Sequence, residues 1–334
     1  MRTTTLTGTA LAAVLLLSAA CGSGPRGGGD AEAAAADFPA RPITLVVPYG
    51  AGGSTDTIAR VLADHLERSL GQPVAVENVP GGVGAVGVQR VFNAEPDGHT
   101  LAMASGSILT VTPQTTELEY DPMEMTFVAS THESVAARFV SGESQWQTIE
   151  DLVAWGAQEG NELVDATSGG FGVNDIGTAS LSEAVGGLNY RPLATDGGAE
   201  AVVRILAGDA DMNQNSATAA LPYVESGELR PLLIESPSWP ELAELGVPTS
   251  QELYGYTIIN PSAVLAPPDL PDEIRQVLED AIRDALEDEE VAERMRGTFE
   301  LVGFRSGADA QEYAQQAYDS YTPIIEAMGA GIGE

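Results

Sequence analysis

The chain has 334 residues, a length that predicts about two domains of ~150 residues each. Its 43% apolar residues can build sizeable cores, which excludes a disordered acidic polymer. The 15 cationic side chains, all Arg, are outnumbered by 49 Asp and Glu, giving a net charge of −34 that argues against nucleic acid and anionic lipid headgroups as partners. The absence of Lys excludes Schiff-base and Walker-type lysine chemistry, and the single Cys excludes an intramolecular disulfide.

Residues 1–20 predict a secretory signal. One positive charge, Arg2, precedes an apolar run from Leu11 to Leu17 and small residues before Cys21. The run is too short to span a bilayer. The arrangement resembles a bacterial lipobox with Ser where Leu is more frequent, so we expect Cys21 to be lipidated and to start the mature chain. The alternative is an ordinary cleaved signal with an incidental Cys.

The Gly- and Ala-rich residues 21–37 predict a flexible tether, so the folded part should begin near Phe38. We therefore expect an extracytoplasmic lipoprotein anchored to the outer face of the cell membrane. Outside the cell there is no pool of ATP or NAD, so we expect no cofactor.

From residue 43 the pattern alternates strand and helix. The apolar run at 43–48 is typical of a strand buried on both faces, and the pattern up to residue 105 has a βαβαβ order, which predicts a parallel sheet covered by helices. The predicted elements are strands at 43–48, 74–79 and 100–105, with a helix from Thr55 to Leu70 and a short one ending near Glu95.

The middle of the chain repeats this order, which indicates two similar lobes. The predicted elements are helices at 148–158, 176–185 and 199–206 and strands at 163–167, 190–195, 211–215 and 229–235. A strand at 257–265 should then precede a long helix after Pro271. The last helix, at 308–328, contains Pro323, where we expect a kink or break.

Four segments carry a family resemblance. Residues 41–87, RPITLVVPYGAGGSTDTIARVLADHLERSLGQPVAVENVPGGVGAVG, resemble the opening of the substrate-binding proteins of tripartite tricarboxylate transporters, the Bug or TctC-like family. The likeness continues in AEPDGHTLAMAS at 94–105, LRPLLI at 229–234 and AVLAPPDLPDEI at 263–274. It spans nearly all of residues 40–330.

The resemblance implies a two-lobed periplasmic-binding-protein fold, with each lobe a helix-covered mixed or parallel α/β sheet. By analogy, residues 40–130 plus 255–334 form lobe 1 and residues 131–254 form lobe 2. A ligand would bind in a hinged cleft between them, and the closed form would deliver it to the transporter's membrane subunits. We expect a monomer.

Gly- and hydroxyl-rich loops occur where the predicted strands end. Ligands of open α/β sheets bind outside the carboxyl ends of the strands, and helix N-termini there favour a carboxylate. Each loop alone is also compatible with an ordinary βα turn, and it is their agreement with the resemblance that makes them candidates. The candidate ligand-binding residues are Tyr49, Gly50, Ala51, Gly52, Gly53, Ser54, Thr55, Ser105, Gly106, Ser107, Ser168, Gly170, Gly172, Asn174, Thr195, Asp196, Gly197, Asn213 and Asn215.

Two positions depart from the family pattern. Thr195-Asp196-Gly197 replaces a frequent Tyr-Lys-Gly, and Val173-Asn174-Asp175 replaces a Ser-rich stretch leading to His. If Asp175 or Asp196 faces the cleft, it would oppose a dianionic ligand and favour an amine or a single carboxylate. Asp175 is also well placed to cap a helix, which is the interpretation we favour.

Other motifs carry less weight. Gly82–Gly87 matches G-x-G-x-x-G but follows the second strand, so we expect a turn there and no dinucleotide site. The sequence shows no zinc motif and no G-x-S-x-G nucleophile elbow, so we expect no metal site and no catalysis. The acid-rich run 279–290 is most simply a solvated helix face, with calcium binding a remote second.

The leading hypothesis is therefore a non-catalytic binding protein that captures a small organic acid and passes it to a membrane permease. The alternative is a sensor that uses the same fold to signal to a membrane receptor. The sequence leaves the ligand open among dicarboxylates, tricarboxylates, aromatic acids and amino acids.

The net charge far exceeds what ligand binding requires. We hypothesise adaptation to a saline or alkaline exterior, where salt screens the repulsion among the acids. The melting temperature should therefore rise between low and molar NaCl when followed by circular dichroism. A melting temperature unaffected by salt would contradict the hypothesis.

Overall fold

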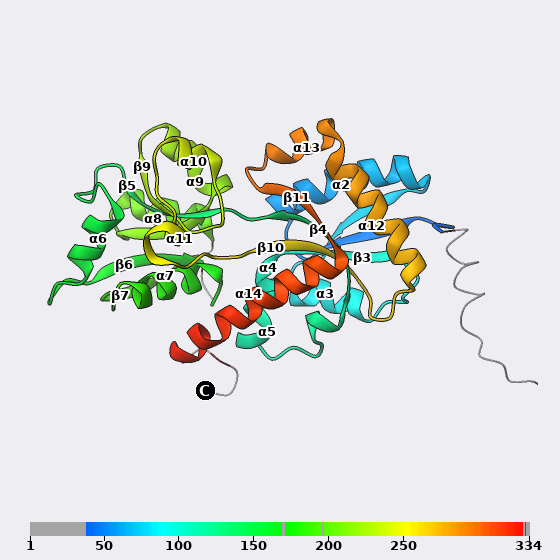
Figure 1. Cartoon of the computed structure of the whole chain (residues 1–334), viewed down its shortest axis with the longest axis horizontal. Coiled ribbons are helices and arrows are strands. Elements are labelled where there is room, and N and C mark those ends of the chain that lie inside the picture. The colour runs from blue at the N-terminus through cyan, green and yellow to red at the C-terminus, as the bar shows by residue number, and fades with distance from the viewer. Residues whose placement is uncertain (1–37, 169–170, 196, 330, 332–334) are drawn as a thin grey trace, which may run out of the picture.

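The computed structural model describes residues 38–168, 171–195, 197–329 and 331, and these form two α/β lobes side by side (Figure 1). The expected signal and tether, including Cys21, lie outside the described residues, as do Gly170 and Asp196. We call the parts around the six-stranded and the five-stranded sheet the first and the second lobe.

The first lobe is built on a mixed six-stranded sheet. Its strand order is β11-β4-β10-β3-β1-β2, with β2 and β3 parallel to β1 and β10 antiparallel to both β3 and β4. The strands are β1 (Ile43–Val47), β2 (Val74–Asn78), β3 (Thr100–Ala104), β4 (Thr126–Glu133), β10 (Pro261–Ala266) and β11 (Leu301–Ser306).

Helices cover both faces of this sheet. Because side chains alternate along a strand, Ile43, Leu45 and Val47 of β1 pack into one core cluster and Val46 into the other. The first cluster contains side chains of α2 (Ser54–Leu70), α12 (Asp272–Glu287) and α13 (Glu289–Arg296). The second contains side chains of α3 (Ala85–Phe92), α4 (Gly106–Thr110) and α14 (Gly307–Ala327).

The second lobe has the five-stranded order β7-β6-β8-β5-β9. Strands β7 and β8 are parallel to β6, whereas β5 runs antiparallel between β8 and β9. The strands are β5 (Ala136–Ser141), β6 (Leu163–Ser168), β7 (Tyr190–Thr195), β8 (Met212–Ser216) and β9 (Leu229–Ile234). Its helices are α6 (Ile149–Gly156), α7 (Val173–Ala184), α8 (Gly198–Ala207), α9 (Ala217–Glu225) and the short α10 (Pro240–Glu244) and α11 (Ser250–Tyr254), whereas the short α5 (Thr112–Thr115) follows α4 in the first lobe.

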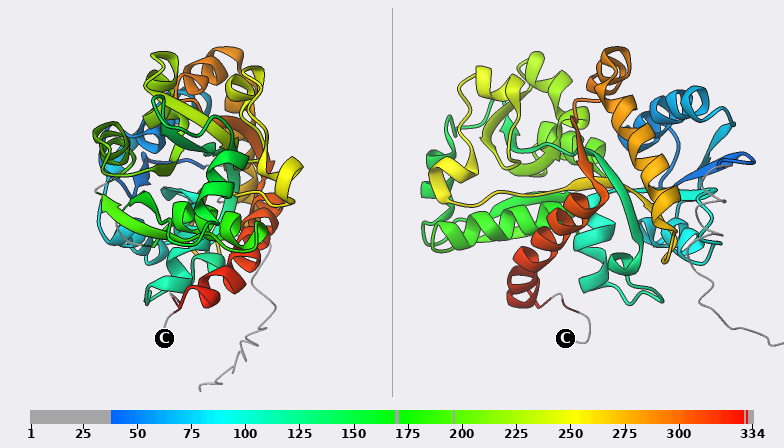
Figure 2. Two further views of the ribbon diagram at one scale, coloured as in Figure 1. Left: turned by 90° about the vertical axis from the view of Figure 1, so that its left-hand side faces the viewer. Right: turned by 45° about the vertical axis from the view of Figure 1, so that its right-hand side comes forward.

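The chain passes between the lobes at residues 134–135 and 257–260, and the Ser134 amide donates to the Asn260 carbonyl at 3.1 Å. The lobes also touch elsewhere. Helix α14 of the first lobe runs against α7 of the second (Figure 2), in a cluster that includes Val173, Ile176 and Tyr321.

Several expected boundaries differ. The strand expected at 257–265 begins only at Pro261. The amides of Ile258 and Ile259 donate to the Glu235 carbonyl and to the Tyr321 hydroxyl, and so they do not pair with a neighbouring strand. Helix α14 continues past Pro323 to Ala327, so the expected break is wrong. Strand β4 runs to Glu133 in the first sheet, so the boundary expected at residue 131 falls inside it.

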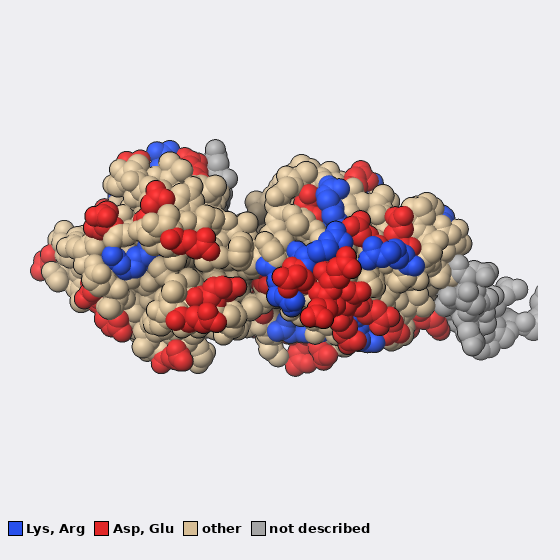
Figure 3. Space-filling view, turned by 90° about the horizontal axis from the view of Figure 1, so that it is seen from above, with Lys and Arg blue, Asp and Glu red and all other residues tan. Residues whose placement is uncertain are grey.

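The acidic run 279–290 is only partly solvated. Glu279 is 5% exposed and pairs with Arg275 at 2.6 Å and Arg283 at 3.0 Å. It also accepts a hydrogen bond from the Gly307 amide at 3.2 Å. Acids and Arg side chains interleave over the first lobe in Figure 3. The expectation of a solvated face is thus wrong for Glu279, whose burial depends on these cations.

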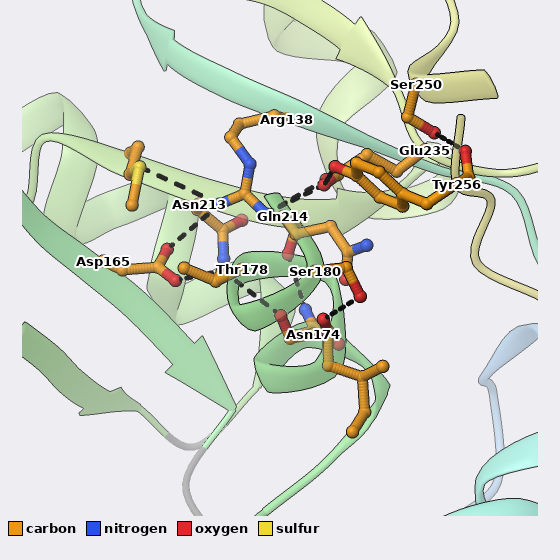
Figure 4. Close-up of polar contacts among 12 residues, drawn as sticks. Arg138, Asp165, Asn174, Thr178, Ser180, Asn213, Gln214, Glu235, Ser250 and Tyr256 are labelled. Atoms are coloured by element: carbon orange, nitrogen blue, oxygen red, sulfur yellow. Dashed lines mark hydrogen bonds and ion pairs between the residues drawn. The ribbon is translucent and has the colours of Figure 1, made fainter. Parts of the chain in front are cut away.

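Arg138 on β5 is completely buried beside two buried carboxylates (Figure 4). Its Nη2 donates to both oxygens of Glu235 at 3.1 Å, and its Nη1 lies 3.8 Å from Oδ1 of Asp165. Tyr256 donates to Glu235 at 2.7 Å, and Thr178 donates to Asp165 at 2.6 Å. Burial raises the pKa of Asp165 to about 6, against the opposing effects of Arg138 and Thr178.

Replacing Arg138 should strongly destabilise the fold, because Glu235 and Asp165 would lose their buried cation. Arg138→Met should lower the free energy of unfolding by about 3–5 kcal/mol in urea titrations. The control Arg191→Met removes an exposed 3.3 Å pair with Glu162 in the same lobe and should cost about 0–1 kcal/mol. Equal losses in the two variants would contradict this account.

Candidate functional site

A cavity of about 440 Å³ lies between the two lobes. The first lobe contributes Ser54, the first residue of α2. The remaining lining residues come from the second lobe and are Asn174, Gly198, Ala199, Asn215, Ser216, Thr218 and Ala219. Three of the sequence-predicted residues, Ser54, Asn174 and Asn215, are thereby brought together from distant parts of the chain.

Four helices begin at the wall of this cavity. Its lining contains first-turn residues of α2, α7, α8 and α9. Helices α7, α8 and α9 follow the mutually aligned strands β6, β7 and β8, whose carboxyl ends lie at one edge of the sheet. Each helix start offers backbone N–H groups without intrahelical partners and about half a positive charge, so the cavity favours an anion.

The described lining side chains are hydroxyls, amides and small apolar groups, and none of these described residues is ionisable. Acids that are not among the lining residues lie close by, in the first turns of three of the four helices. Asp56 of α2 pairs with Arg60 at 2.8 Å and Glu200 of α8 pairs with Arg204 at 2.7 Å. These cations offset the acids, and the first turn of α9 carries no acid.

The third acid, Asp175, caps α7. Its Oδ2 accepts a hydrogen bond from the Gly172 amide at 2.9 Å, as favoured from the sequence. Burial raises the pKa of Asp175 to about 6, although the backbone amides oppose this rise. The neighbouring Asn174 donates to the backbone carbonyl of Gln214 at 2.5 Å (Figure 4), which fixes the start of α7 against β8.

Asn215 organises the second-lobe wall. Its Nδ2 donates to the Gly198 carbonyl at 2.8 Å, and its Oδ1 accepts from the Ser216 amide at 2.9 Å. A Cβ on Gly198 would lie 2.4 Å from Asn215 Oδ1, so only glycine permits this approach. The side chain of Asn215 therefore positions the starts of both α8 and α9.

Hydrogen bonds to side chains on either side of the loop hold the loop before α2 in place, although its glycines are exposed. Asp56 accepts from the Gly52 amide at 2.9 Å and from Asn78 at 2.9 Å. The hydroxyls of Tyr49 and Ser105 lie 2.5 Å apart and join two predicted loops. Burial raises the pKa of Tyr49, so the phenol is neutral and can share this bond.

The other described candidates do not line the cavity. Asn213 is 1% exposed and donates to the Ala166 carbonyl, and Thr195 donates to the Thr167 carbonyl at 2.8 Å. Both side chains therefore hold strands of the second lobe together. The remaining predicted residues outside the lining are Tyr49, Gly50, Ala51, Gly52, Gly53, Thr55, Ser105, Gly106, Ser107, Gly172 and Gly197, whereas the side chain of Ser168 lies outside the described part of the structure.

Sequence reasoning missed the start of α9. Ser216, Thr218 and Ala219 line the cavity, yet the helix they open was not predicted. A signal was present, because Ser216 follows a strand and precedes the Ala-rich run from Ala217, which is typical of an N-cap. Pro222 inside the helix weakened that signal.

The G-x-G-x-x-G stretch begins with a single 3-10 turn at Gly82–Gly84, where a turn was expected, and continues into the first turn of α3. Gly84 has φ +97°, and a Cβ there would lie 3.1 Å from the Tyr49 ring. A Cβ on Gly87 would lie 2.7 Å from Pro48. These glycines thus let the turn pack against the loop before α2.

Two searches of the described residues found nothing. No three or more His, Cys, Asp or Glu side chains are grouped to hold a metal ion in the described part of the chain. Among the same residues, no helix combines the length and apolar character needed to cross a bilayer.

Comparisons place the chain among transport proteins. Residues 58–330 match the tripartite tricarboxylate transporter family receptor (TctC). A Cupriavidus necator relative, described as UPF0065 protein in gbd 5' region, is 31% identical over 310 residues, covering 90% of this chain and 91% of the relative.

Solved structures share the fold. MatC of Rhodopseudomonas palustris with bound malate has a TM-score of 0.72 at 24% identity, covering 86% of this chain and 100% of that one. Rpa4515 of R. palustris with adipate has a TM-score of 0.76 at 24% identity, covering 88% and 99%. With the family match over residues 58–330, the chain belongs to the TctC family of tripartite tricarboxylate transporter receptors.

Proposed function

We propose that the protein captures a small organic carboxylate in the cavity between its lobes and delivers it to the membrane subunits of a tripartite tricarboxylate-type transporter. The observation that carries this proposal is the convergence of four helix N-termini on one cavity lined by Ser54, Asn174 and Asn215. Such termini bind anions through backbone N–H groups, so the absence of Lys is no obstacle.

The cavity suits a small ligand. Its volume of about 440 Å³ lies at the lower end of the usual ~300–1,000 Å³ for ligand pockets. Two relatives of the same fold are described with malate and with adipate, both dicarboxylates. With lining residues from both lobes, a ligand that contacts both would favour the closed arrangement.

The proposal includes export and anchoring. A lipid on Cys21 would hold the chain at the outer face of the membrane, with residues 21–37 as the tether to the folded lobes. The receptor would then act near the membrane subunits that accept its ligand. It would need no cofactor and no catalytic group.

Malate and adipate should raise the melting temperature of the purified protein in a thermal-shift screen. A ligand at 100 times its dissociation constant stabilises a fold by about 2.7 kcal/mol. The control is NaCl at matched ionic strength, because salt alone should stabilise this acidic chain. The screen also includes tricarboxylates, monocarboxylates, aromatic acids and amino acids. A shift only with monocarboxylates or amino acids would place Asp196 in the site. No shift with any of these carboxylates would contradict the proposal.

Ser54→Ala should weaken carboxylate binding about 10- to 100-fold, because it removes one hydrogen bond to a charged group. Isothermal titration calorimetry measures the change. The matched control is Ser69→Ala at the other end of α2, where the hydroxyl bonds to the Leu66 carbonyl. Equal affinities for wild type and Ser54→Ala would remove the start of α2 from the site.

A further inference from the structure

Glu300 is a buried carboxyl where the two lobes meet. It lies between α13 and β11 and is only 7% exposed. Two residues earlier, the Thr298 carbonyl accepts a hydrogen bond from Thr218 of the second lobe at 2.9 Å. One residue later, Leu301 packs against the core of the second lobe. The segment around Glu300 is therefore held by both lobes.

The Glu300 carboxyl lies next to a residue of the ligand cavity. The side chains of Ser54 and Ser134 and the backbone of Val135 interact with it. Its Oε2 is buried without a hydrogen-bond partner among the described residues. Ser54 lines the 440 Å³ cavity, whereas Glu300 lines a separate cavity of about 300 Å³. Ser54 therefore both neighbours Glu300 and lines the cavity proposed for the ligand.

The protonation state of Glu300 decides what Ser54 can offer. A serine hydroxyl has one proton to donate and lone pairs that accept. An ionised Glu300 attracts that proton and leaves only lone pairs for a ligand carboxylate, which they repel. A protonated Glu300 can donate to the Ser54 oxygen, which leaves the hydroxyl proton free for the ligand.

Burial raises the pKa of Glu300 to about 7, although Ser54, Ser134 and the Val135 backbone oppose the rise. Arg296 of α13 and Glu241 of α10 line the same cavity as Glu300. Other charged groups on the elements around it include the Asp56–Arg60 pair of α2 and the Glu133–Arg305 pair of β4 and β11. Arg296 is itself paired with Glu293 at 2.7 Å. Near neutral pH, a small change at Ser54 can therefore shift the proton on Glu300.

We propose that Glu300 is a positioning residue that couples the binding of a carboxylate at Ser54 to the uptake of one proton. This inference rests on the proposed carboxylate-binding function. The proton comes from solvent and binds the Glu300 carboxylate. The result is a chain from Glu300 O–H to the Ser54 oxygen and from the Ser54 O–H to the ligand, with no covalent change.

Calorimetry of the purified protein with malate and with adipate tests the proposal. Titrations at pH 8 in HEPES and in Tris, whose ionisation enthalpies differ, give the number of protons taken up. Wild type should take up close to one proton, and its dissociation constant should rise up to tenfold per pH unit above pH 7. Binding without proton uptake in wild type would overturn the inference while the proposed function stands. Absence of binding by any carboxylate would overturn both.

Glu300→Gln keeps the shape and replaces the carboxyl with a neutral amide that can donate to Ser54. It should bind without proton uptake, and its dissociation constant should change less than twofold between pH 6 and pH 9. The matched control is Asp175→Asn, which neutralises another acid near the cavity whose pKa is raised. That variant should retain the uptake. Loss of proton uptake in Asp175→Asn with retained uptake in Glu300→Gln would overturn the assignment of the proton to Glu300. The proton count of the wild-type protein tests the coupling even if a variant fails to fold.

Discussion

The guanidinium of Arg138 is enclosed by protein on every side, and a cation in such a place is stable only with carboxylates against it. Glu235 follows β9, Asp165 lies on β6, and Tyr256 lies in the segment leading to the second crossing between the lobes. One buried charge therefore joins strands and a crossover that are distant in sequence. Through Asp165 and Thr178 it also fixes α7, whose first turn carries Asn174 into the cavity. The position of the second-lobe wall thus depends on a buried group that does not line the cavity.

The net charge of −34 repels an anionic ligand. Binding of an anion therefore requires a local attraction in the site that exceeds this repulsion. Much of the acidity lies on the surface beside Arg, as over α12 and α13 in Figure 3, and salt screens such charges over about 8 Å. The attraction in the cavity has a different origin, because the partial charges of helix N-termini act within a single turn. Asp56 and Glu200, two acids in the first turns of helices that begin at the cavity, are paired with Arg60 and Arg204. A local dipolar field can therefore favour an anion even though the distant net charge opposes it.

Much of the fold followed from pattern alone, because β1 and α2 have the apolar periodicities that their burial requires. Strands β4 and β5 were missed. Their buried positions include His132, Glu133 and Arg138, which are polar, and only pairing across the sheet and to other elements makes those positions interior. In the site, Ser54, Asn174 and Asn215 were predictable because glycine-rich or polar stretches occur at the carboxyl ends of strands in the two sheets. Glu300 was not, because its burial arises only where both lobes meet.

The segment from Thr298 to Leu301 connects the arrangement of the lobes to the chemistry of the site. Val302 and Phe304, which follow it, pack against the first-lobe core, whereas Leu301 packs against the core of the second. Any change in the angle between the lobes must therefore alter the distances among Glu300, Ser54 and Ser134, which belong to the segment, to α2 and to the first crossover. Under the proposed coupling, the proton affinity of Glu300 depends on those distances and would differ between lobe arrangements. By reciprocity, the proposed coupling implies that whatever shifts the lobes would also shift the proton, which would link closure around a carboxylate to protonation of Glu300.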